Sequence, residues 1–196
     1  MPKDGSMSES KKKILEAASK LFLEGGAKAM SVRAIAAKAG VSTIGIYSHF
    51  NGKQGILDTL FIEATQMVSA AMDAGNGAPT PKAAMMANAE AYLDMAEQHY
   101  AHYRLFFGES DPDYTPSEEA QELAQAAFKK LRDHAAKLYP AGAPGKDIQE
   151  TALTFWALLH GFVGLTRHMG APRAGVDNWR DLIMRTVEEK LDTYLN

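Results

Sequence analysis

Residues 31–50 read SVRAIAAKAGVSTIGIYSHF, and this stretch decides how the first third of the chain folds. Ser31 and Ser42 each precede a short run with apolar residues at helical spacing. Serine is a favoured N-cap, because its side-chain oxygen accepts a hydrogen bond from a free amide of the first helical turn. Gly40 lies between the two runs, and glycine commonly ends a helix. The stretch therefore predicts two short helices joined by a turn.

Helices are also predicted on both sides of this pair. Apolar residues recur at helical spacing over 11–24, before Gly25-Gly26, and again from Lys53 until the loop at 75–81. Further helices are predicted at 81–99, 100–107, 117–139, 147–169 and 177–194, between loops that contain Pro and Gly. No strand pattern competes with them. We expect an all-α protein with a disordered arm at 1–10, a small domain at 11–52 and a larger helical domain at 53–196.

Composition narrows the functions that are open to the chain. It has 196 residues, 46% of them hydrophobic, and can bury a core. Cysteine is absent, which excludes disulfides, thiolate zinc sites and thiol nucleophiles. The sequence also lacks the G-x-S-x-G, P-loop, H-E-x-x-H and dinucleotide fingerprints, so we expect no enzymatic activity. No run approaches the roughly 18 apolar residues that span a bilayer, and no secretion signal is visible, so we expect a cytoplasmic protein.

Positive charge is concentrated near the N-terminus. The first 60 residues hold nine Lys or Arg against five Asp or Glu, a net charge of +4, whereas residues 61–196 hold twelve against nineteen, a net charge of −7. A local basic excess suits a polyanion such as DNA. An ordinary solvated surface can carry the same excess, so charge alone leaves both interpretations open.

Two short helices joined by a turn form the helix-turn-helix arrangement, in which the second helix enters the major groove of DNA. The groove is about 12 Å wide, so the side chains that face the bases must be modest in size. Thr43, Ile44, Gly45 and Ser48 meet this condition. Thr43 can hydrogen-bond a base edge, and Ile44 can touch a thymine methyl. Gly45 costs about 1 kcal/mol of helix propensity, which indicates that close approach of the backbone to DNA matters there.

Donors beside this helix are spaced to reach phosphates. Tyr47, His49 and Lys53 are the candidates, and Lys53 also begins a helix whose N-terminal amides attract anions. Arg33 is the only arginine in the first 60 residues and the best candidate for a bidentate contact to guanine. Each also has an ordinary interpretation, since Tyr47 could fill the core and His49 could be a surface histidine. Core positions are predicted at Ile35, Ile46 and Phe50.

Residues 11–60 closely resemble the DNA-binding domain of TetR/AcrR-type transcriptional regulators. The matching features are ILEAA followed by LF, the motif S-V-R-x-I-A-x-x-A-G-V-S, the Y-x-H-F end of the second helix and the N-G-K start of the next. The resemblance implies a DNA-binding domain at 11–52 and an effector-binding and dimerisation domain at 53–196. By position, it implies DNA contacts from Ser31, Arg33, Ser42, Thr43, Ile44, Gly45, Tyr47, Ser48, His49 and Lys53.

The resemblance also implies a small-molecule effector, and the larger domain has residues compatible with a bulky hydrophobic one. Methionine and aromatic side chains provide adaptable apolar walls, although any one of them can simply fill a core. We expect ligand contacts from Met67, Tyr92, Met95, Tyr103, Phe106, Phe107, Phe155, Trp156 and His160. His160 lies in an apolar helix, so it could be a hydrogen-bonded core group or could orient a polar ligand. His99 and His102 lie one turn apart without a clearly spaced third ligand, so no metal site and no cofactor is expected.

The last two helices are expected to form a homodimer. Residues 151–165, TALTFWALLHGFVGL, are apolar almost all the way round, which favours burial on both sides. Pairing this helix and the helix at 177–194 across a two-fold axis would form a four-helix bundle, with Gly161 and Gly164 allowing close approach. Two recognition helices related by that axis would read a palindromic site in double-stranded DNA.

Three functions can be weighed against these residues. A dimeric, effector-responsive repressor agrees best with them. The alternative is an all-helical ligand-binding protein or enzyme with a vestigial DNA-binding head, which saturable turnover of a small molecule would support. An architectural DNA-binding protein without sequence preference would need more overall basicity than an isoelectric point of about 6.1 indicates.

Overall fold

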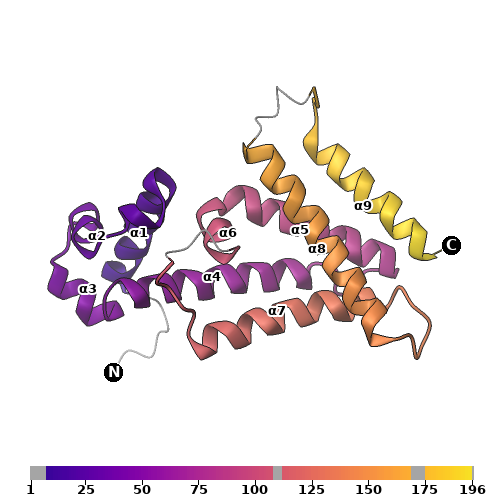
Figure 1. The fold of residues 1–196 in the computed structure, drawn as a ribbon, viewed down its shortest axis with the longest axis horizontal. Coiled ribbons are helices and arrows are strands. Elements are labelled where there is room, and N and C mark those ends of the chain that lie inside the picture. The colour runs from indigo at the N-terminus through magenta and orange to yellow at the C-terminus, as the bar shows by residue number, and fades with distance from the viewer. Residues whose placement is uncertain (1–7, 108–111, 169–174, 196) are drawn as a thin grey trace. The chain divides into compact units, whose positions relative to one another are not determined.

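The computed structural model describes residues 8–107, 112–168 and 175–195 (Figure 1). Within these ranges the chain forms nine α-helices, one short 3-10 helix (η1, Ala27–Ala29) and no strand, so the all-α prediction is confirmed. The helices are α1 (Glu9–Gly25), α2 (Val32–Ala39), α3 (Thr43–Phe50), α4 (Lys53–Asp73), α5 (Pro81–Gln98), α6 (Tyr100–Phe106), α7 (Glu118–Ala136), α8 (Gly145–His168) and α9 (Trp179–Leu195). Ser8 caps α1, so the helix starts inside the arm expected at 1–10, and residues 1–7 of that arm lie outside the described ranges.

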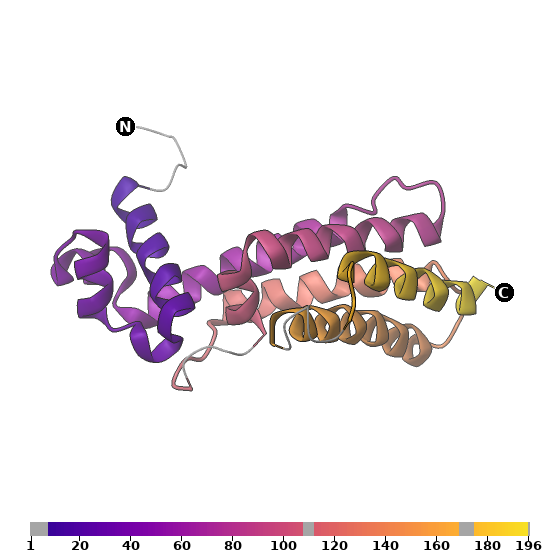
Figure 2. The ribbon, with the colours of Figure 1, turned by 90° about the horizontal axis from the view of Figure 1, so that it is seen from above.

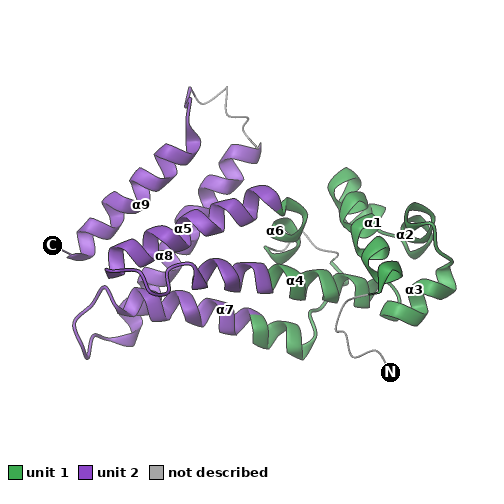
Figure 3. Cartoon of the chain, turned by 180° about the vertical axis from the view of Figure 1, so that it is seen from behind, with its two compact units in different colours: residues 1–65, 99–123 green, residues 66–98, 124–196 purple. Residues whose placement is uncertain are grey.

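The helices pack as two compact units, which are coloured separately in Figure 3. Unit 1 comprises residues 1–65 and 99–123, and unit 2 comprises residues 66–98 and 124–196. Helices α4 and α7 each begin in unit 1 and end in unit 2. Unit 1 therefore holds more of the chain than residues 11–52, because α6 and the first turns of α4 share its core.

The core of unit 1 is built from one face of each of its helices. The three core residues predicted near the helix-turn-helix, Ile35, Ile46 and Phe50, are all buried. Ala101 and Leu105 of α6 pack into the same cluster. Further members are Ile14, Leu15, Ala17, Ala18, Phe22, Met30, Ala36, Ile56, Leu57, Leu60 and Tyr114. Removal of this apolar surface from water is the main force that holds the short helices together.

One carboxylate joins the start of α4 to the segment that leads into α7. Asp58 accepts hydrogen bonds from the Tyr114 hydroxyl (3.0 Å), the Ser117 amide (2.8 Å) and the Ser117 hydroxyl (2.7 Å). Burial, together with the nearby Asp58 charge, raises the pKa of the Tyr114 phenol above its ordinary value. The Ser117 side chain also accepts a hydrogen bond from the Ala120 amide (3.2 Å) and so caps α7. Asp58 therefore fixes where α7 begins.

Unit 2 is organised around α5, α8 and α9, which pack on one another (Figures 1 and 2). The buried face of α9 consists of Ile183, Val187 and Leu191, which are spaced four residues apart. The buried face of α8 includes Phe155, Leu159 and Val163. The face of α8 opposite to these residues is left outside the unit's core.

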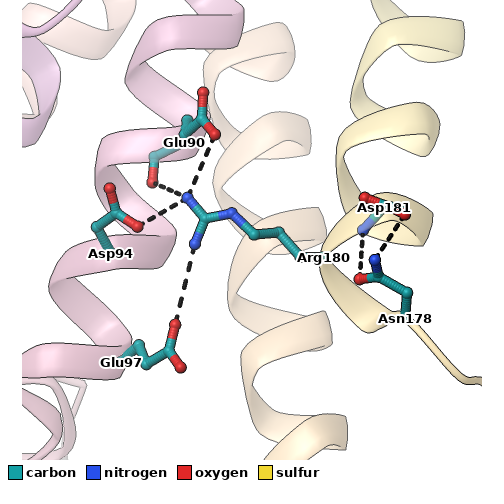
Figure 4. Close-up of polar contacts among 6 residues, drawn as sticks. All are labelled: Glu90, Asp94, Glu97, Asn178, Arg180 and Asp181. Carbon is teal, nitrogen blue, oxygen red and sulfur yellow. Dashed lines mark hydrogen bonds and ion pairs between the residues drawn. The ribbon is translucent and has the colours of Figure 1, made fainter.

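Ion pairs tie α5 and α9 together at both ends, so the two helices run antiparallel. At one end, Lys82 of α5 contacts Asp192 (2.6 Å) and Glu188 (3.0 Å) of α9. At the other end, Arg180 of α9 contacts Asp94 (2.7 Å) and Glu90 (3.4 Å) of α5, as Figure 4 shows. These pairs are partly exposed, so they specify how the helices align more than they add stability.

His134 of α7 is a buried titratable group, with 4% of its surface exposed. It hydrogen-bonds the backbone of Met72, and its Nδ1 atom has no hydrogen-bond partner among the described residues. Burial, aided by the positive charge of Lys137, lowers the pKa of the imidazole below its ordinary value. The neutral ring is therefore the form that the folded protein prefers.

The stability of the protein should fall with acidification through His134. Because its pKa is lower in the folded state, the unfolded chain binds more protons once the pH drops below about 6.5. Changing the pH from 7.5 to 5.5 should therefore lower the free energy of unfolding, as measured by urea denaturation. His134→Gln keeps a donor for the Met72 backbone and should lose less over the same interval. Equal losses in the two proteins would contradict this role for His134.

Candidate DNA-binding site

The predicted helix-turn-helix is present, with both serine caps in place. The Ser31 hydroxyl accepts a hydrogen bond from the Ala34 amide (3.1 Å), and the Ser42 hydroxyl accepts one from the Gly45 amide (3.1 Å). Gly40 ends α2 in the left-handed conformation (φ 67°, ψ 34°), which glycine adopts without steric cost. The chain therefore turns sharply between α2 and α3 and returns to helical geometry at a capped position.

Helix α3 has one buried and one exposed face. Ile46 is fully buried and Phe50 is 8% exposed. The opposite face carries Thr43, Ile44, Tyr47 and Ser48, all of which are exposed. Ile44 is 78% exposed and Tyr47 is 58% exposed, so Tyr47 does not fill the core. An apolar side chain as exposed as Ile44 at the centre of such a face is suited to contact with a partner's apolar group.

The connection between α3 and α4 depends on backbone positions that a side chain would block. Asn51 (φ 56°) and Gly52 (φ 95°) are both in the left-handed region, and a Cβ on Gly52 would lie 3.1 Å from the Tyr47 ring. At Gly55 a Cβ would lie 1.7 Å from the carbonyl oxygen of Phe50. Gly55 was not identified from the sequence, although the spacing N-G-K-x-G after α3 carried the signal.

Of the predicted phosphate donors, Tyr47 and His49 lie on α3 and Lys53 begins α4, while further expected DNA contacts lie at the helix starts nearby. The Lys53 ammonium donates to the Ala27 carbonyl (3.0 Å). Ser31 and Ser42 use an oxygen lone pair for capping and keep their hydroxyl hydrogen for a phosphate. Arg33 is exposed in the first turn of α2, and no described residue pairs with its guanidinium. His49 is half-buried against the Phe50 ring, with 6.4 Å between ring centroids.

The predicted effector contacts are divided between the two units. Tyr103, Phe106 and Phe107 belong to unit 1, where the Phe107 ring centroid lies 4.8 Å from those of the other two. Met67, Tyr92, Met95, Phe155, Trp156 and His160 belong to unit 2. Of these, Tyr92, Met95 and Phe155 are buried, and the Trp156 ring packs on Phe128 with 5.3 Å between centroids.

One histidine differs from an interpretation that the sequence left open, and another has a carboxylate partner. His160 is exposed and is therefore not a core group. It lies on the outward face of α8, which also carries Ala157 and Gly161. His102 pairs with the Glu63 carboxylate (3.1 Å), and its ring also lies edge-on to the His99 ring, with 6.1 Å between ring centroids. Among the described residues no three His, Asp or Glu side chains are grouped so as to hold a metal ion.

A capped helix-turn-helix with an exposed second helix, followed by a larger helical part, defines a DNA-binding regulator. Comparison with protein families gives the same class. The family described as "Bacterial regulatory proteins, tetR family" matches residues 14–60, and "Tetracyclin repressor-like, C-terminal domain" matches residues 85–189. The chain belongs to the TetR family of transcriptional regulators.

Solved structures share this fold at low sequence identity. A regulatory protein of the tetR family from Rhodococcus RHA1 is 21% identical, with a TM-score of 0.74 over 96% of this chain and 98% of that one. The TetR family regulator PfmR from Thermus thermophilus is 22% identical, with a TM-score of 0.70 over 97% of both chains. No curated protein sequence matches the chain. Across the described ranges, no helix combines the length and apolar character needed to cross a membrane.

Two glycine substitutions should separate DNA recognition from folding. At Gly45 a Cβ would lie 3.5 Å from the Ser42 hydroxyl, an ordinary contact, so Gly45→Ala should raise stability by about 0.5–1 kcal/mol through helix propensity. The same methyl would keep the backbone away from the groove, and we expect it to weaken DNA binding by about 1–3 kcal/mol. Thermal unfolding and fluorescence anisotropy with labelled duplex measure the two effects.

Gly55→Ala is the matched control. Its Cβ would overlap the Phe50 carbonyl, so we expect a loss of stability of about 1–3 kcal/mol or more. If Gly45→Ala bound DNA as well as the unchanged protein, close backbone approach at that position would be ruled out.

Proposed function

We propose that the protein is a homodimeric transcriptional repressor that binds a palindromic operator and releases it when a small hydrophobic effector binds. The observation that carries the proposal is the division of α3 into a buried face that holds it in the core and an exposed face of Thr43, Ile44, Tyr47 and Ser48. An operator lies on cytoplasmic DNA, so in this proposal the protein acts in the cytoplasm.

Base contacts in this proposal come from α3 and from the start of α2. Thr43 hydrogen-bonds a base edge, Ile44 packs on a thymine methyl and Arg33 binds guanine with two parallel hydrogen bonds. Ser31, Ser42, Ser48, Tyr47, His49 and Lys53 hold the phosphates on either side, and Gly45 lets the helix enter the groove. The phosphate contacts supply affinity, and the base contacts supply sequence preference.

The dimer in this proposal is formed through α8 and α9. The outward face of α8 exposes Leu153 (44%) and Leu165 (42%), and α9 exposes Leu195 (46%). Ala157 and Gly161 lie on the same outward face and would let a second helix approach closely. Burial of these side chains against a second copy would remove apolar surface from water.

The effector in this proposal binds among the apolar side chains of unit 2, where Met67, Tyr92, Met95, Phe155 and Trp156 are the expected contacts. Helix α4 begins immediately after the recognition helix and ends in unit 2. A ligand that favours one position of α4 would change the spacing of the two recognition helices, so effector and DNA affinities would be reciprocally coupled.

Selection from a random duplex library at about 150 mM salt tests the DNA-binding role. The unchanged protein should enrich a palindrome, because two symmetry-related recognition helices read two half-sites. Arg33→Ala should lose about 1–3 kcal/mol of discrimination at one base pair per half-site, whereas Lys53→Ala should weaken all sequences similarly and flatten the salt dependence. Enrichment of no sequence would mean either that a bound ligand already holds the two heads apart or that the head is vestigial in a ligand-binding protein. If Arg33→Ala lost the same binding free energy on matched and on scrambled DNA, the proposed contact between Arg33 and a base would be wrong.

Leu153→Glu tests the dimer interface. A charge at this position would be buried in the proposed dimer without a partner, so the mass measured by light scattering should shift from dimer to monomer at micromolar concentration. Leu23→Glu is the matched control, since Leu23 of α1 is exposed to nearly the same extent (46%) and lies outside the proposed interface. A Leu153→Glu protein that stays dimeric would place the interface elsewhere.

A further inference from the structure

Unit 2 contains a pocket of about 280 Å³ between α5, α8 and α9. Its floor is apolar and consists of Leu93, Ala96, Val163 and Ile183, all of them buried. Its polar lining consists of Glu97, Thr166, Arg167 and Arg180, and Trp179 completes it. None of these residues belongs to the effector contacts expected from the sequence, so this is a separate candidate site.

Arg180 enters this pocket with part of its hydrogen-bonding capacity unused. One guanidinium nitrogen, Nη2, binds Asp94 (2.7 Å) and Glu90 (3.4 Å) (Figure 4). The other, Nη1, has as its nearest acceptor among the described residues a Glu97 oxygen at 3.9 Å, which is too far for a hydrogen bond. The Nη1 donors of Arg180 therefore lack a hydrogen-bond acceptor within the described part of the chain.

A second donor at the same pocket is also unsatisfied. The Trp179 indole Nε1 atom is buried, and no described residue accepts a hydrogen bond from it. An indole nitrogen can only donate, and a guanidinium can only donate. Arg167 adds another guanidinium to the lining. A buried donor without an acceptor is costly, so a ligand that brings an acceptor close to Trp179 Nε1 would be favoured.

The carboxylate that now faces Arg180 Nη1 can be displaced. The Glu97 side chain is 72% exposed, and its pair with Arg180 is long. Exposed ion pairs of this kind contribute little, so rotation of Glu97 into solvent has a small cost. Asp94, at 2.7 Å on the other guanidinium nitrogen, would keep Arg180 in place.

We propose that this pocket binds a small organic acid, with its carboxylate on Arg180 Nη1 and its apolar body on the floor formed by Leu93, Val163 and Ile183. A carboxylate matches the planar guanidinium with short, charge-assisted hydrogen bonds. The buried floor excludes water from the apolar body, which favours acids that carry a hydrocarbon or aromatic group over small hydrophilic anions. The proposal does not rest on the DNA-binding role, because binding to this pocket can be measured without DNA.

Calorimetric titration of the full-length protein tests the ligand class with three probes. They are 4-phenylbutyrate, 4-phenylbutanamide and 4-phenylbutylamine, which share a phenyl group on a four-carbon chain and differ in the polar group. Octanoate serves as an acid with a linear body. At least one of the two acids should bind saturably, once per protomer. If 4-phenylbutyrate binds, the amide and the amine should bind more weakly than it does by a factor of about ten or more. Stronger binding of the amine, or no saturable binding of either acid, would overturn the proposal.

Two variants test the contacts. Arg180→Gln should weaken acid binding by about tenfold or more, because it removes the charged donor. Glu97→Gln should leave acid binding unchanged or tighten it, because it removes the competing carboxylate. Weaker acid binding by Glu97→Gln would contradict the assignment of Glu97 as the carboxylate that competes for Arg180 Nη1.

Two control variants distinguish direct contact between Arg180 and the acid from an indirect effect through weaker packing of α9. Arg185→Gln makes the same chemical change at an exposed position of α9 outside the pocket lining and should bind the acid normally. Lys82→Gln breaks the ion pairs at the far end of α5 and α9 without touching the pocket. If Lys82→Gln weakened acid binding as much as Arg180→Gln, the effect of Arg180 would be structural and the proposed contact wrong. DNA selection on the same proteins reports separately on the proposed regulatory function.

Discussion

The close approach of α4 to the end of α3 is the constraint on which unit 1 depends. At Gly55 the backbone passes so near the Phe50 carbonyl that no side chain fits between them. This contact sets where α4 leaves the recognition helix, and Asp58, one turn later, sets where α7 begins. The recognition helix is thus held by α4 through backbone geometry as well as through the apolar core.

Unit 2 uses a different kind of constraint. Helices α5 and α9 pack through an apolar face and are aligned by ion pairs at both ends. At one end the cation, Lys82, lies on α5, and at the other end the cation, Arg180, lies on α9. Such a pattern penalises a parallel arrangement or a shifted register, because like charges would then meet. At the Arg180 end, the three acidic side chains of α5 satisfy only part of one guanidinium, which gives the pocket beside it its polar character.

Local signals predicted most of the fold, whereas contacts between distant residues could not be predicted. The serine caps at 31 and 42 and the glycine at 40 act on neighbouring residues, and each has its expected counterpart in the structure. Gly55 lies in the spacing N-G-K-x-G, but this pattern alone does not show that a Cβ there would overlap the Phe50 carbonyl. His160 lies in a segment that is apolar all round, so the sequence could not show which face turned outward. The pocket beside Arg180 combines three helices, and its key feature is a donor that no described residue satisfies.

The separation of α3 into two faces also bears on how such a protein can evolve. Ile46 and Phe50 hold the helix, whereas the exposed positions at 43, 44, 47 and 48 have little to do with its stability. Substitutions on the outer face can therefore accumulate without unfolding the protein, and each can be tried against a new DNA sequence. The fold itself is shared among chains that are only about one-fifth identical over their length.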